Sequence, residues 1–354
     1  MKILHLIPSM GSGGAERQLS VLATALSEKG LDCHIGYCSD GPNLERLSAG
    51  MVSIHQFSLK NNHDPRLLLH IIRLIRAVKP DLIQTWLLQM DVMGGLAAVL
   101  TGVPFILSER SSASCYPNNW KFFLRKKMAD KASSIIANSQ GGIDYWRSLK
   151  TETPLFLIRN CVQTDGQLAD LQEQLPGEPR LIVVAGRLSP EKNVILLLDA
   201  LIVILKKSYN TRVKIFGEGP LKEQLQARIN QQQMADKISL EGYTQNLPAW
   251  LSRAELCVSI SDYEGNPNVV LEAAAAECPL VLSDIQAHRE IFDDSQVNFV
   301  DHKSLEKIIS GIQTALEHRE SSHSKAVRAR DVLTDYSIDK ILQQYLDVYH
   351  KAVE

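Results

Sequence analysis

The sequence predicts an α/β protein made of two doubly wound, Rossmann-like domains that face one another across a cleft. Its 354 residues are more than one compact core usually holds. Short β-branched runs alternate with segments of helical period, and this alternation runs through the chain twice, on either side of a polar stretch at 162–180. Because alternating strands and helices form parallel sheets covered on both faces, each half is expected to form one such domain.

The first half begins with a strand at 2–7 and a helix at 14–30. Leu19 and Leu26 lie on one face of that helix, and Gly30 is a typical residue for its end. The further strands expected here are 32–38, 52–57, 81–86, 104–109 and 133–139, and the further helices are 66–80, 90–101, 117–130 and one that starts at Gly141.

The second half repeats the pattern and then becomes helical. The expected strands are 180–188, 212–219, 238–243, 256–261 and 279–284, and the expected helices are 192–207, 219–233, a short one near Pro248 and 268–277. Past Val300 we expect only helices, the last of which has an apolar stripe that needs a surface to pack against. The predicted parts are therefore domains at 1–162 and 163–335 and a C-terminal helix at 336–354.

Composition and charge exclude several classes of protein. The formal charge of −2 gives no general attraction to nucleic acid, and the six cysteines include no CxxC pair, so neither zinc ligands nor disulfides are expected. The N-terminal apolar run is too short for a signal peptide, and Gly102 and Pro104 interrupt the most apolar tract. We expect a cytoplasmic protein without membrane-spanning segments.

Two loops that follow predicted strands have features that are typical of phosphate-binding sites. MGSGGAERQL (10–19) joins a strand to a helix, where glycines permit close backbone approach and the helix N-terminus offers N–H groups. It is not a GxGxxG motif, since Glu16 stands in place of the third glycine, and a simple tight turn is the alternative. In GRLSPEKN (186–193), Arg187 and Lys192 can hold phosphate oxygens; the alternative is a solvated loop.

A third stretch, SDYEGNPNVVLEAAAAECP (261–279), carries two glutamates eight residues apart. Pro267 is expected at the first helical position with Asn266 as the N-cap, which puts Glu264 in the loop and Glu272 about one turn into the helix. A glycosidase pair needs two carboxylates that flank one bond, and a metal needs more clustered oxygens, so neither is favoured. The pair suits hydroxyls at two ends of an extended ligand; two surface glutamates are the alternative.

These motifs resemble those of the retaining, nucleotide-sugar-dependent glycosyltransferases of family 4, which have the two-domain GT-B fold. The matching segments are GGAERQL, GRLSPEKN, GEGPLKEQL, EGYTQN and EGNPNVVLEAAAAECPLV. The resemblance implies an enzyme of hexosyltransferase type that moves a sugar, from an expected UDP-sugar, to a glycan or lipid-linked saccharide, as in bacterial cell-surface polysaccharide or oligosaccharide assembly. It implies neither metal nor other cofactor, because the nucleotide-sugar is a co-substrate. It also implies an acceptor-side first domain, a donor-binding second domain and a last helix that crosses back to the first.

The resemblance assigns roles to individual residues. Arg187 and Lys192 match the cations on the donor diphosphate, and Glu264 matches the residue that faces the transferred sugar; these three form the expected catalytic set. The residues expected to bind substrate are Gly13 and Gly14 at the diphosphate, Gly217 near the nucleobase, Glu272 at the ribose, and Asn266, Pro267, Asn268 and Val269 around the helix start.

The sequence departs from the family pattern in several places. Glu277 stands where glycine is usual, so the preceding helix has to end on a strained residue. Glu109 and Arg110 occupy positions where many members have a histidine, and are only candidates for acceptor contacts. Segment 118–131 mixes aromatic and basic residues, so it is either a helix on an anionic membrane at the inner face of the cell membrane or a core helix with a basic surface.

Other functions remain open on the same architecture. A sugar-nucleotide epimerase would act without an acceptor, and a phosphorylase would need a lysine for pyridoxal phosphate that the sequence does not point to. A non-catalytic glycan- or lipid-binding relative is the third alternative, against which the intact set of Arg187, Lys192, Glu264 and Glu272 argues.

Overall fold

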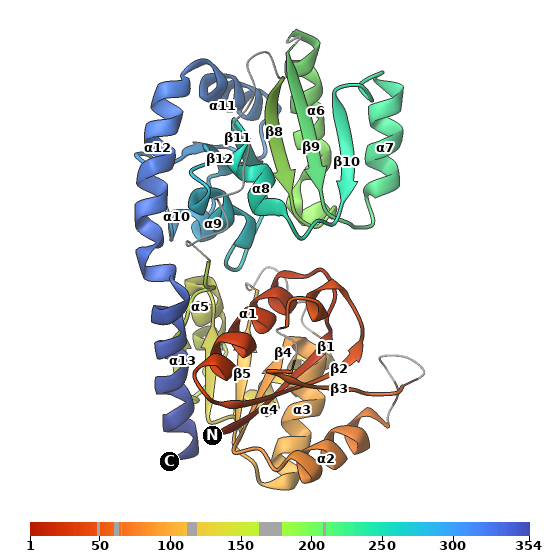
Figure 1. Cartoon of the computed structure of the whole chain (residues 1–354), viewed down its shortest axis with the longest axis vertical. Coiled ribbons are helices and arrows are strands. Elements are labelled where there is room, and N and C mark those ends of the chain that lie inside the picture. Colours follow the sequence, from red (N-terminus) through yellow and green to blue (C-terminus); the bar gives the residue numbers. More distant parts are fainter. Residues whose placement is uncertain (48–49, 60–63, 65, 112–118, 163–178, 208–209) are drawn as a thin grey trace. The chain divides into compact units, whose positions relative to one another are not determined.

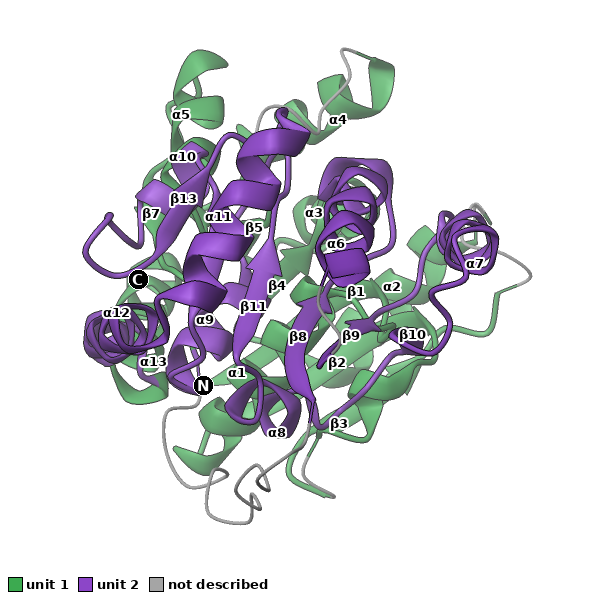
Figure 2. Cartoon of the chain, turned by 90° about the horizontal axis from the view of Figure 1, so that it is seen from above, with its two compact units in different colours: residues 1–161, 338–354 green, residues 162–337 purple. Residues whose placement is uncertain are grey.

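The computed structural model describes residues 1–47, 50–59, 64, 66–111, 119–162, 179–207 and 210–354 (Figure 1). The chain divides into two compact units (Figure 2). Unit 1 is Met1–Cys161 together with Ile338–Glu354, and unit 2 is Val162–Ser337. Most of the polar stretch expected as a linker, 163–178, lies outside the described residues, as does the start of the 118–131 segment.

Unit 1 contains a parallel sheet of seven strands in the order β3-β2-β1-β4-β5-β6-β7. The strands are β1 (Lys2–Ser9), β2 (Asp32–Ser39), β3 (Ser53–Gln56), β4 (Leu82–Trp86), β5 (Phe105–Glu109), β6 (Ser134–Ala137) and β7 (Leu155–Leu157). The helices are α1 (Gly14–Glu28), α2 (Leu67–Val78), α3 (Leu87–Thr101), α4 (Trp120–Ala129), α5 (Gln140–Ser148) and α13 (Ile338–Val353), with a 3₁₀ turn, η1, at Pro42–Leu44.

The alternation of side chains along β1 builds a core on each face of this sheet. Ile3 and Ile7 point to the face covered by α1 and α13, whereas Leu4 and Leu6 point to the face covered by α2 and α3. The apolar stripe of α13 packs in the first of these cores, through side chains such as Tyr345. The expected return of the C-terminal helix to the first domain is therefore confirmed.

Unit 2 contains a parallel sheet of six strands in the order β10-β9-β8-β11-β12-β13. The strands are β8 (Arg180–Ala185), β9 (Thr211–Phe216), β10 (Ile238–Gly242), β11 (Leu256–Ser259), β12 (Leu280–Ser283) and β13 (Asn298–Val300). The helices are α6 (Val194–Lys207), α7 (Lys222–Gln231), α8 (Leu247–Ser252), α9 (Asn268–Ala275), α10 (Gln286–Arg289), α11 (Leu305–Glu317) and α12 (Arg319–Val332), with 3₁₀ turns η3 (Pro190–Lys192) and η4 (Leu333–Tyr336).

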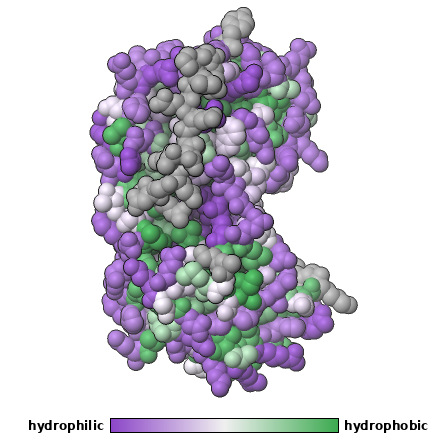
Figure 3. Space-filling view, viewed as in Figure 1, coloured by the Kyte–Doolittle hydropathy of each residue, from purple (hydrophilic) through white to green (hydrophobic). Residues whose placement is uncertain are grey.

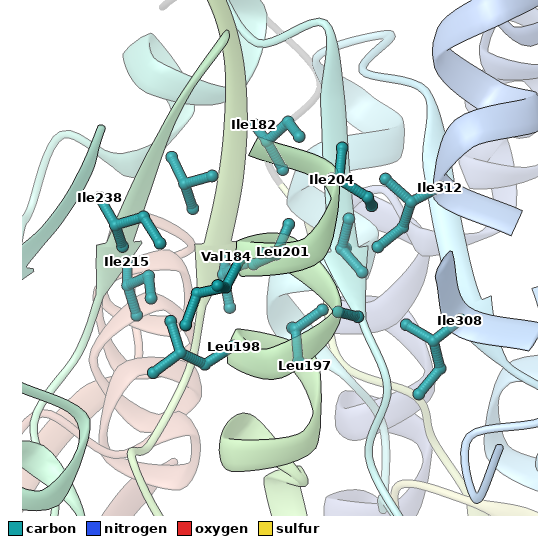
Figure 4. Close-up of a cluster of buried hydrophobic side chains, with 14 of the residues drawn as sticks. Ile182, Val184, Leu197, Leu198, Leu201, Ile204, Ile215, Ile238, Ile308 and Ile312 are labelled. Carbon is teal, nitrogen blue, oxygen red and sulfur yellow. The ribbon is translucent and has the colours of Figure 1, made fainter. Parts of the chain in front are cut away.

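The core of unit 2 is also double-faced. Ile182 and Val184 of β8 pack with α6 and α11 on one face, as the close-up in Figure 4 shows for Leu198, Leu201 and Ile312. The intervening side chains of β8 pack with α8, α9 and α12 on the other face. Both units are thus Rossmann-like, and the predicted fold class is confirmed.

Some expected elements differ in their bounds. The strands β7 and β13 were not expected; each has three residues, too few for a periodic signal. The helix expected at 268–277 is shorter, because α9 ends at Ala275. Pro267 is the N-cap of α9 instead of its first residue, which corrects the expected role of Asn266 as the cap.

The face of the molecule drawn in Figure 3 is largely polar. Figure 3 shows hydrophilic residues over most of the visible face of both units, with hydrophobic side chains reaching the surface in places on unit 1. Within the described ranges, no helix combines the length and the apolar character that crossing a bilayer requires.

Candidate functional site

The strand order of unit 2 reverses between β8 and β11. From β8 the chain proceeds to β9 and β10 on one side of the sheet, and then to β11, β12 and β13 on the other. In open parallel sheets, ligands bind beyond the carboxyl ends of the strands at such a switch point. The loops after β8 and β11 are therefore the expected location of a ligand-binding site.

A cation and a carboxylate from these two loops meet there. Lys192, in the loop after β8, donates from Nζ to Oε1 of Glu264, in the loop after β11, at 2.5 Å. The Oγ of Ser261 donates to the same oxygen at 2.6 Å. Burial raises the pKa of Glu264, but the positive charge of Lys192 and the hydrogen bonds from Lys192 and Ser261 outweigh burial, so the net pKa is lowered and the carboxylate is charged at neutral pH.

Backbone and side-chain hydrogen bonds hold the two loops together. The amide of Asp262 donates to the carbonyl of Glu191 at 2.8 Å, which joins the loop after β11 directly to η3. Asn193 follows η3 in the left-handed conformation, with φ of 53°, and its Nδ2 donates to the carbonyl of His302 at 2.9 Å. The residues immediately before and after Lys192 are therefore both held by hydrogen bonds to other parts of unit 2.

Glycines close the neighbouring strand ends. Gly186 and Gly217, which follow β8 and β9, have φ of 146° and 131°, and a Cβ on Gly217 would lie 1.9 Å from the carbonyl oxygen of Gly186. Only glycine fits at position 217, because its backbone lies directly against that carbonyl.

Arg187, which follows Gly186, is exposed. Its backbone is thus at the same edge of the sheet as Lys192.

The first turn of α9 follows Glu264 closely. Pro267 has no N–H and cannot donate a backbone hydrogen bond to a ligand, and Val270 donates within the chain to the carbonyl of Pro267 at 3.1 Å. Asn268 and Val269 begin the helix and are half-buried, while Asn266 just before them is buried. Glu272 lies one turn further along α9 and is 8% exposed.

His288 is a residue of this site that the sequence reasoning missed. It belongs to α10, directly after β12, and its side chain is fully buried. Its Nδ1 lies 2.9 Å from the carbonyl oxygen of Ser283, and the charges of Glu264 and Lys192 both act on its ring. The sequence does hold a signal for His288, because this histidine shortly follows a predicted strand. Loops after the strands of a parallel sheet lie at the same edge as the other candidate residues.

In unit 1 the corresponding switch point lies between β1 and β4. Gly13 caps α1 and Gly14 is its first residue. A Cβ on Gly13 would lie 2.2 Å from Oε2 of Glu16, whose Oε1 accepts from the hydroxyl of Ser9 at 3.1 Å. Glycine at position 13 therefore makes room for a carboxylate of the same helix, near its positive end.

Glu109 and Arg110 both have partners within unit 1. Glu109 is fully buried; Arg125 donates from Nη1 to its Oε2 at 2.8 Å, and Trp146 donates to the same oxygen at 3.0 Å. Contact between Glu109 and an acceptor substrate would require these hydrogen bonds to break.

Arg110 is tied to the C-terminal helix. Its Nη2 donates to the hydroxyl of Tyr345 in α13 at 2.5 Å, and its guanidinium stacks over Trp86 at 4.1 Å. Its place in the fold is thus to hold α13 against the sheet of unit 1.

Carboxylates, histidines and cysteines are the side chains that could bind a metal ion. In the described part of the chain, no group of three or more such side chains is arranged to hold a metal ion. That the reaction needs no metal ion remains a prediction.

Comparisons with known proteins agree with this architecture. The family model for group 1 glycosyl transferases matches residues 168–332, and the model for glycosyltransferase family 4 matches residues 12–165. A Campylobacter jejuni enzyme, N-acetylgalactosamine-N,N'-diacetylbacillosaminyl-diphospho-undecaprenol 4-alpha-N-acetylgalactosaminyltransferase, is 25% identical over 89% of this chain and 90% of its own length.

Two further proteins are similar. GDP-mannose:cellobiosyl-diphosphopolyprenol alpha-mannosyltransferase of Xanthomonas oryzae is 26% identical over 73% of this chain and 70% of its own length. The crystal structure of Anabaena HepE in complex with UDP-glucose superposes with a TM-score of 0.85 at 19% identity, covering 98% of both chains. That last likeness concerns the fold alone.

The two Rossmann-like units with parallel sheets have the GT-B fold. The matched family models and the Campylobacter relative identify the chain as a glycosyltransferase. With both family models matched, the chain belongs to family 4 of the glycosyltransferases.

Proposed function

We propose that this enzyme transfers a sugar from a UDP-sugar to a lipid-linked saccharide or surface polysaccharide, with retention of configuration and without a metal, at the cytoplasmic face of the membrane. The observation that carries the proposal is the Lys192–Glu264 pair at the switch point of unit 2. This pair brings a fixed positive charge and a fixed carboxylate to the edge of the sheet where a nucleotide-sugar would bind.

The charges that develop in such a reaction match these residues. When the bond between the anomeric carbon and the diphosphate oxygen breaks, both bonding electrons stay with the diphosphate, and the sugar becomes positively charged. Lys192, Arg187 and the N-terminus of α9 would stabilise the diphosphate. The acceptor hydroxyl forms the new bond on the face that the diphosphate leaves, and its proton passes to a diphosphate oxygen. Glu264 would orient the sugar, and Glu272 would accept hydrogen bonds from the ribose hydroxyls.

The other predicted contacts complete the donor site in this proposal. Gly13 and Gly14 would meet the diphosphate from unit 1, and Gly217 would lie near the base. Asn266 and Val269 would contact the sugar and diphosphate through their backbones. Glu109 and Arg110 are not part of the proposed acceptor contacts, since both are engaged within unit 1.

The relatives support the substrate classes without agreeing on the nucleotide. Two of them are named for acceptors on diphospho-polyprenol lipids. HepE binds UDP-glucose, whereas the Xanthomonas enzyme is named for GDP-mannose. UDP is proposed because HepE, whose fold matches 98% of this chain, holds UDP-glucose.

Helix α4 is the proposed membrane contact. Trp120 and Phe123 are 68% and 60% exposed, and Lys121 and Lys127 lie on the same exposed surface. Aromatic side chains beside lysines suit an anionic lipid surface. Arg125, which the sequence pattern counted among the basic residues of this surface, is 2% exposed and does not contribute to it.

The test is a panel of radiolabelled UDP-, GDP- and ADP-sugars with membrane lipid extracts as acceptor, and with Glu264→Ala as the control. Release of UDP that depends on acceptor, with an α-linked product from an α-linked donor, supports the proposal. An epimerised donor without acceptor would instead indicate an epimerase, and binding without turnover would indicate a non-catalytic protein. Activity that disappears with EDTA and returns with a divalent metal would refute metal independence.

A further inference from the structure

His288 occupies the third of three adjacent strand ends in unit 2. It follows β12, which neighbours β11, and β11 neighbours β8. Lys192 and Glu264 follow the other two of these strands. The side chain of His288 is fully buried, and the function proposed above gives it no task.

The hydrogen bonds of His288 determine which ring nitrogen carries the proton. Nδ1 lies 2.9 Å from the carbonyl oxygen of Ser283, which can only accept, and 3.2 Å from the hydroxyl oxygen of the same residue, which can accept as well. The proton is therefore on Nδ1, and Nε2 bears a lone pair. Burial lowers the pKa of His288 and Lys192 lowers it further, which outweighs the opposite effect of Glu264, so the ring is neutral at neutral pH.

The lone pair on Nε2 has no partner within the described residues, although the atom is buried. Buried polar atoms are nearly always hydrogen-bonded, so this nitrogen calls for a donor. The charged Glu264 cannot supply one, because its carboxylate also only accepts. Two acceptors in one neighbourhood, one charged and one neutral, suit a ligand that carries several hydroxyl groups.

We propose that His288 is a specificity-determining residue that accepts a hydrogen bond from a hydroxyl group of the transferred sugar through Nε2. This inference rests on the proposed nucleotide-sugar function. It assigns the nucleotide and the sugar to different residues: the diphosphate to Arg187 and Lys192, and recognition of one sugar hydroxyl to His288.

Two substitutions separate the two ring nitrogens. His288→Asn keeps a donor near the position of Nδ1, facing the carbonyl of Ser283, and removes the acceptor at the position of Nε2. His288→Gln reaches the position of Nε2 with an amide and can supply an acceptor there. The pair therefore differs mainly in the group under test, and thermal unfolding shows whether both variants are folded.

Calorimetric titrations with UDP, UDP-glucose, UDP-galactose and their N-acetylhexosamine counterparts measure the effect. We expect His288→Asn to weaken binding of the preferred UDP-sugar about tenfold, the usual effect of one lost hydrogen bond, while UDP binds as before. His288→Gln should recover part of the loss. Equal weakening of UDP and UDP-sugar in His288→Asn, or full affinity for both, would overturn the inference.

Deoxy-sugar analogues of the preferred donor identify the hydroxyl. For one ring position, removing the hydroxyl should cost the wild-type enzyme about tenfold in affinity and should cost His288→Asn almost nothing. The inference is refuted if every deoxy analogue loses the same factor in both proteins. If the wild type binds UDP but no UDP-sugar, or binds neither, the proposed function fails at that earlier step and the inference fails with it.

Discussion

The ammonium of Lys192 donates to Oε1 of Glu264 across 2.5 Å, although 72 residues separate the two in the chain. Their loops follow neighbouring strands, β8 and β11, on either side of the point where the strand order reverses. The contact therefore depends on the topology of the sheet, and it prepares both side chains before any ligand arrives. A preformed pair of this kind reduces the reorganisation that binding and catalysis require.

The first prediction concerns this pair. Lys192→Gln should reduce kcat by roughly one to three orders of magnitude, as removal of a preorganised charge does. Glu264→Gln should also reduce kcat, and the double variant should lose less than the product of the single losses, because each single change leaves the other side chain without its partner. Steady-state kinetics with the identified donor measures this.

Lys214→Gln is the matched control, since Lys214 also pairs with a glutamate of unit 2, Glu241. It should keep kcat within about twofold, as expected for a partly exposed pair on neighbouring strands to which the proposed reaction gives no role. Strictly multiplicative losses in the double variant would contradict a functional link between Lys192 and Glu264.

The second prediction concerns α4. Replacing Trp120 and Phe123 by serine should weaken binding to phosphatidylglycerol vesicles by at least about tenfold, because both exposed aromatic side chains would enter the lipid interface. Leu69→Ser removes another exposed apolar side chain, 54% exposed on α2, and should leave vesicle binding unchanged. Flotation of the protein with the vesicles measures this binding. Equal binding by both variants would show that α4 is part of the surface of unit 1 without being a membrane contact.

The third prediction is a pH dependence. Burial and, to a smaller extent, Arg110 lower the pKa of His5 to about 3. The neutral ring favours the folded state fully above pH 6.5, and this contribution is lost as the pH falls from 6.5 towards 3, because the unfolded chain binds the proton first.

His5→Gln removes the titrating group. The difference in unfolding free energy between wild type and His5→Gln should therefore shift against the wild type by up to about 1.4 kcal/mol per pH unit below pH 6.5. Urea unfolding of both proteins at pH 7.5, 6.0 and 5.0 measures it. Parallel losses in the two proteins would mean that other groups account for the acid sensitivity.

The fourth prediction concerns the buried charges beneath α4. Arg125 donates from Nε to Asp91 and from Nη1 to Glu109, each at 2.8 Å, and all three side chains are buried. Arg125→Met should destabilise unit 1 by about 3–5 kcal/mol, because two buried carboxylates then lack their counter-charge. Lys126→Met, the neighbouring residue with an i,i+4 partner in Asp130, should cost no more than about 0.5 kcal/mol.

Denaturant unfolding distinguishes the two variants. Adding Asp91→Asn and Glu109→Gln to Arg125→Met should restore part of the lost stability, since neutral amides tolerate burial better than charges. If Arg125→Met is as mild as Lys126→Met, the buried ion pairs contribute little to the fold.

The sequence was sufficient to predict the order of most strands and helices, because each carries its own periodicity and its own end signals. It also placed Arg187, Lys192 and Glu264 in loops after strands, and such loops of a parallel sheet gather at one edge. Local pattern and spacing carry that information without any knowledge of distant contacts.

Arg125 and His288 depend on distant contacts instead. On the α4 sequence Arg125 looks like its lysine neighbours, and only Asp91 and Glu109, from α3 and β5, explain its burial. The relevance of His288 arises because β12 lies beside β11, which no spacing within the sequence states. The pairing of strands and the partners of buried charges are tertiary properties, so they required the structure.

The last prediction concerns the end of α9. The amide of Cys278 donates to the carbonyl of Ala273 at 2.9 Å, and that of Glu277 donates to Ala274 at 3.1 Å. These two bonds form a Schellman motif, which requires a left-handed residue at the position of Glu277, and Glu277 has φ of 51°. Glycine adopts this conformation without steric cost, whereas other residues lose roughly 1–2 kcal/mol there.

Glu277→Gly and Glu277→Ala separate this strain from the ion pair that Glu277 makes with Arg330. Both variants lose the pair, which is partly exposed and contributes at most about 1 kcal/mol, but only the alanine keeps a Cβ in the left-handed region. We expect the glycine variant to be about 1 kcal/mol more stable than the alanine variant in urea unfolding of unit 2. Equal stability of the two would mean that the backbone at Glu277 relaxes without cost, and the helix end would then have another cause than the left-handed residue.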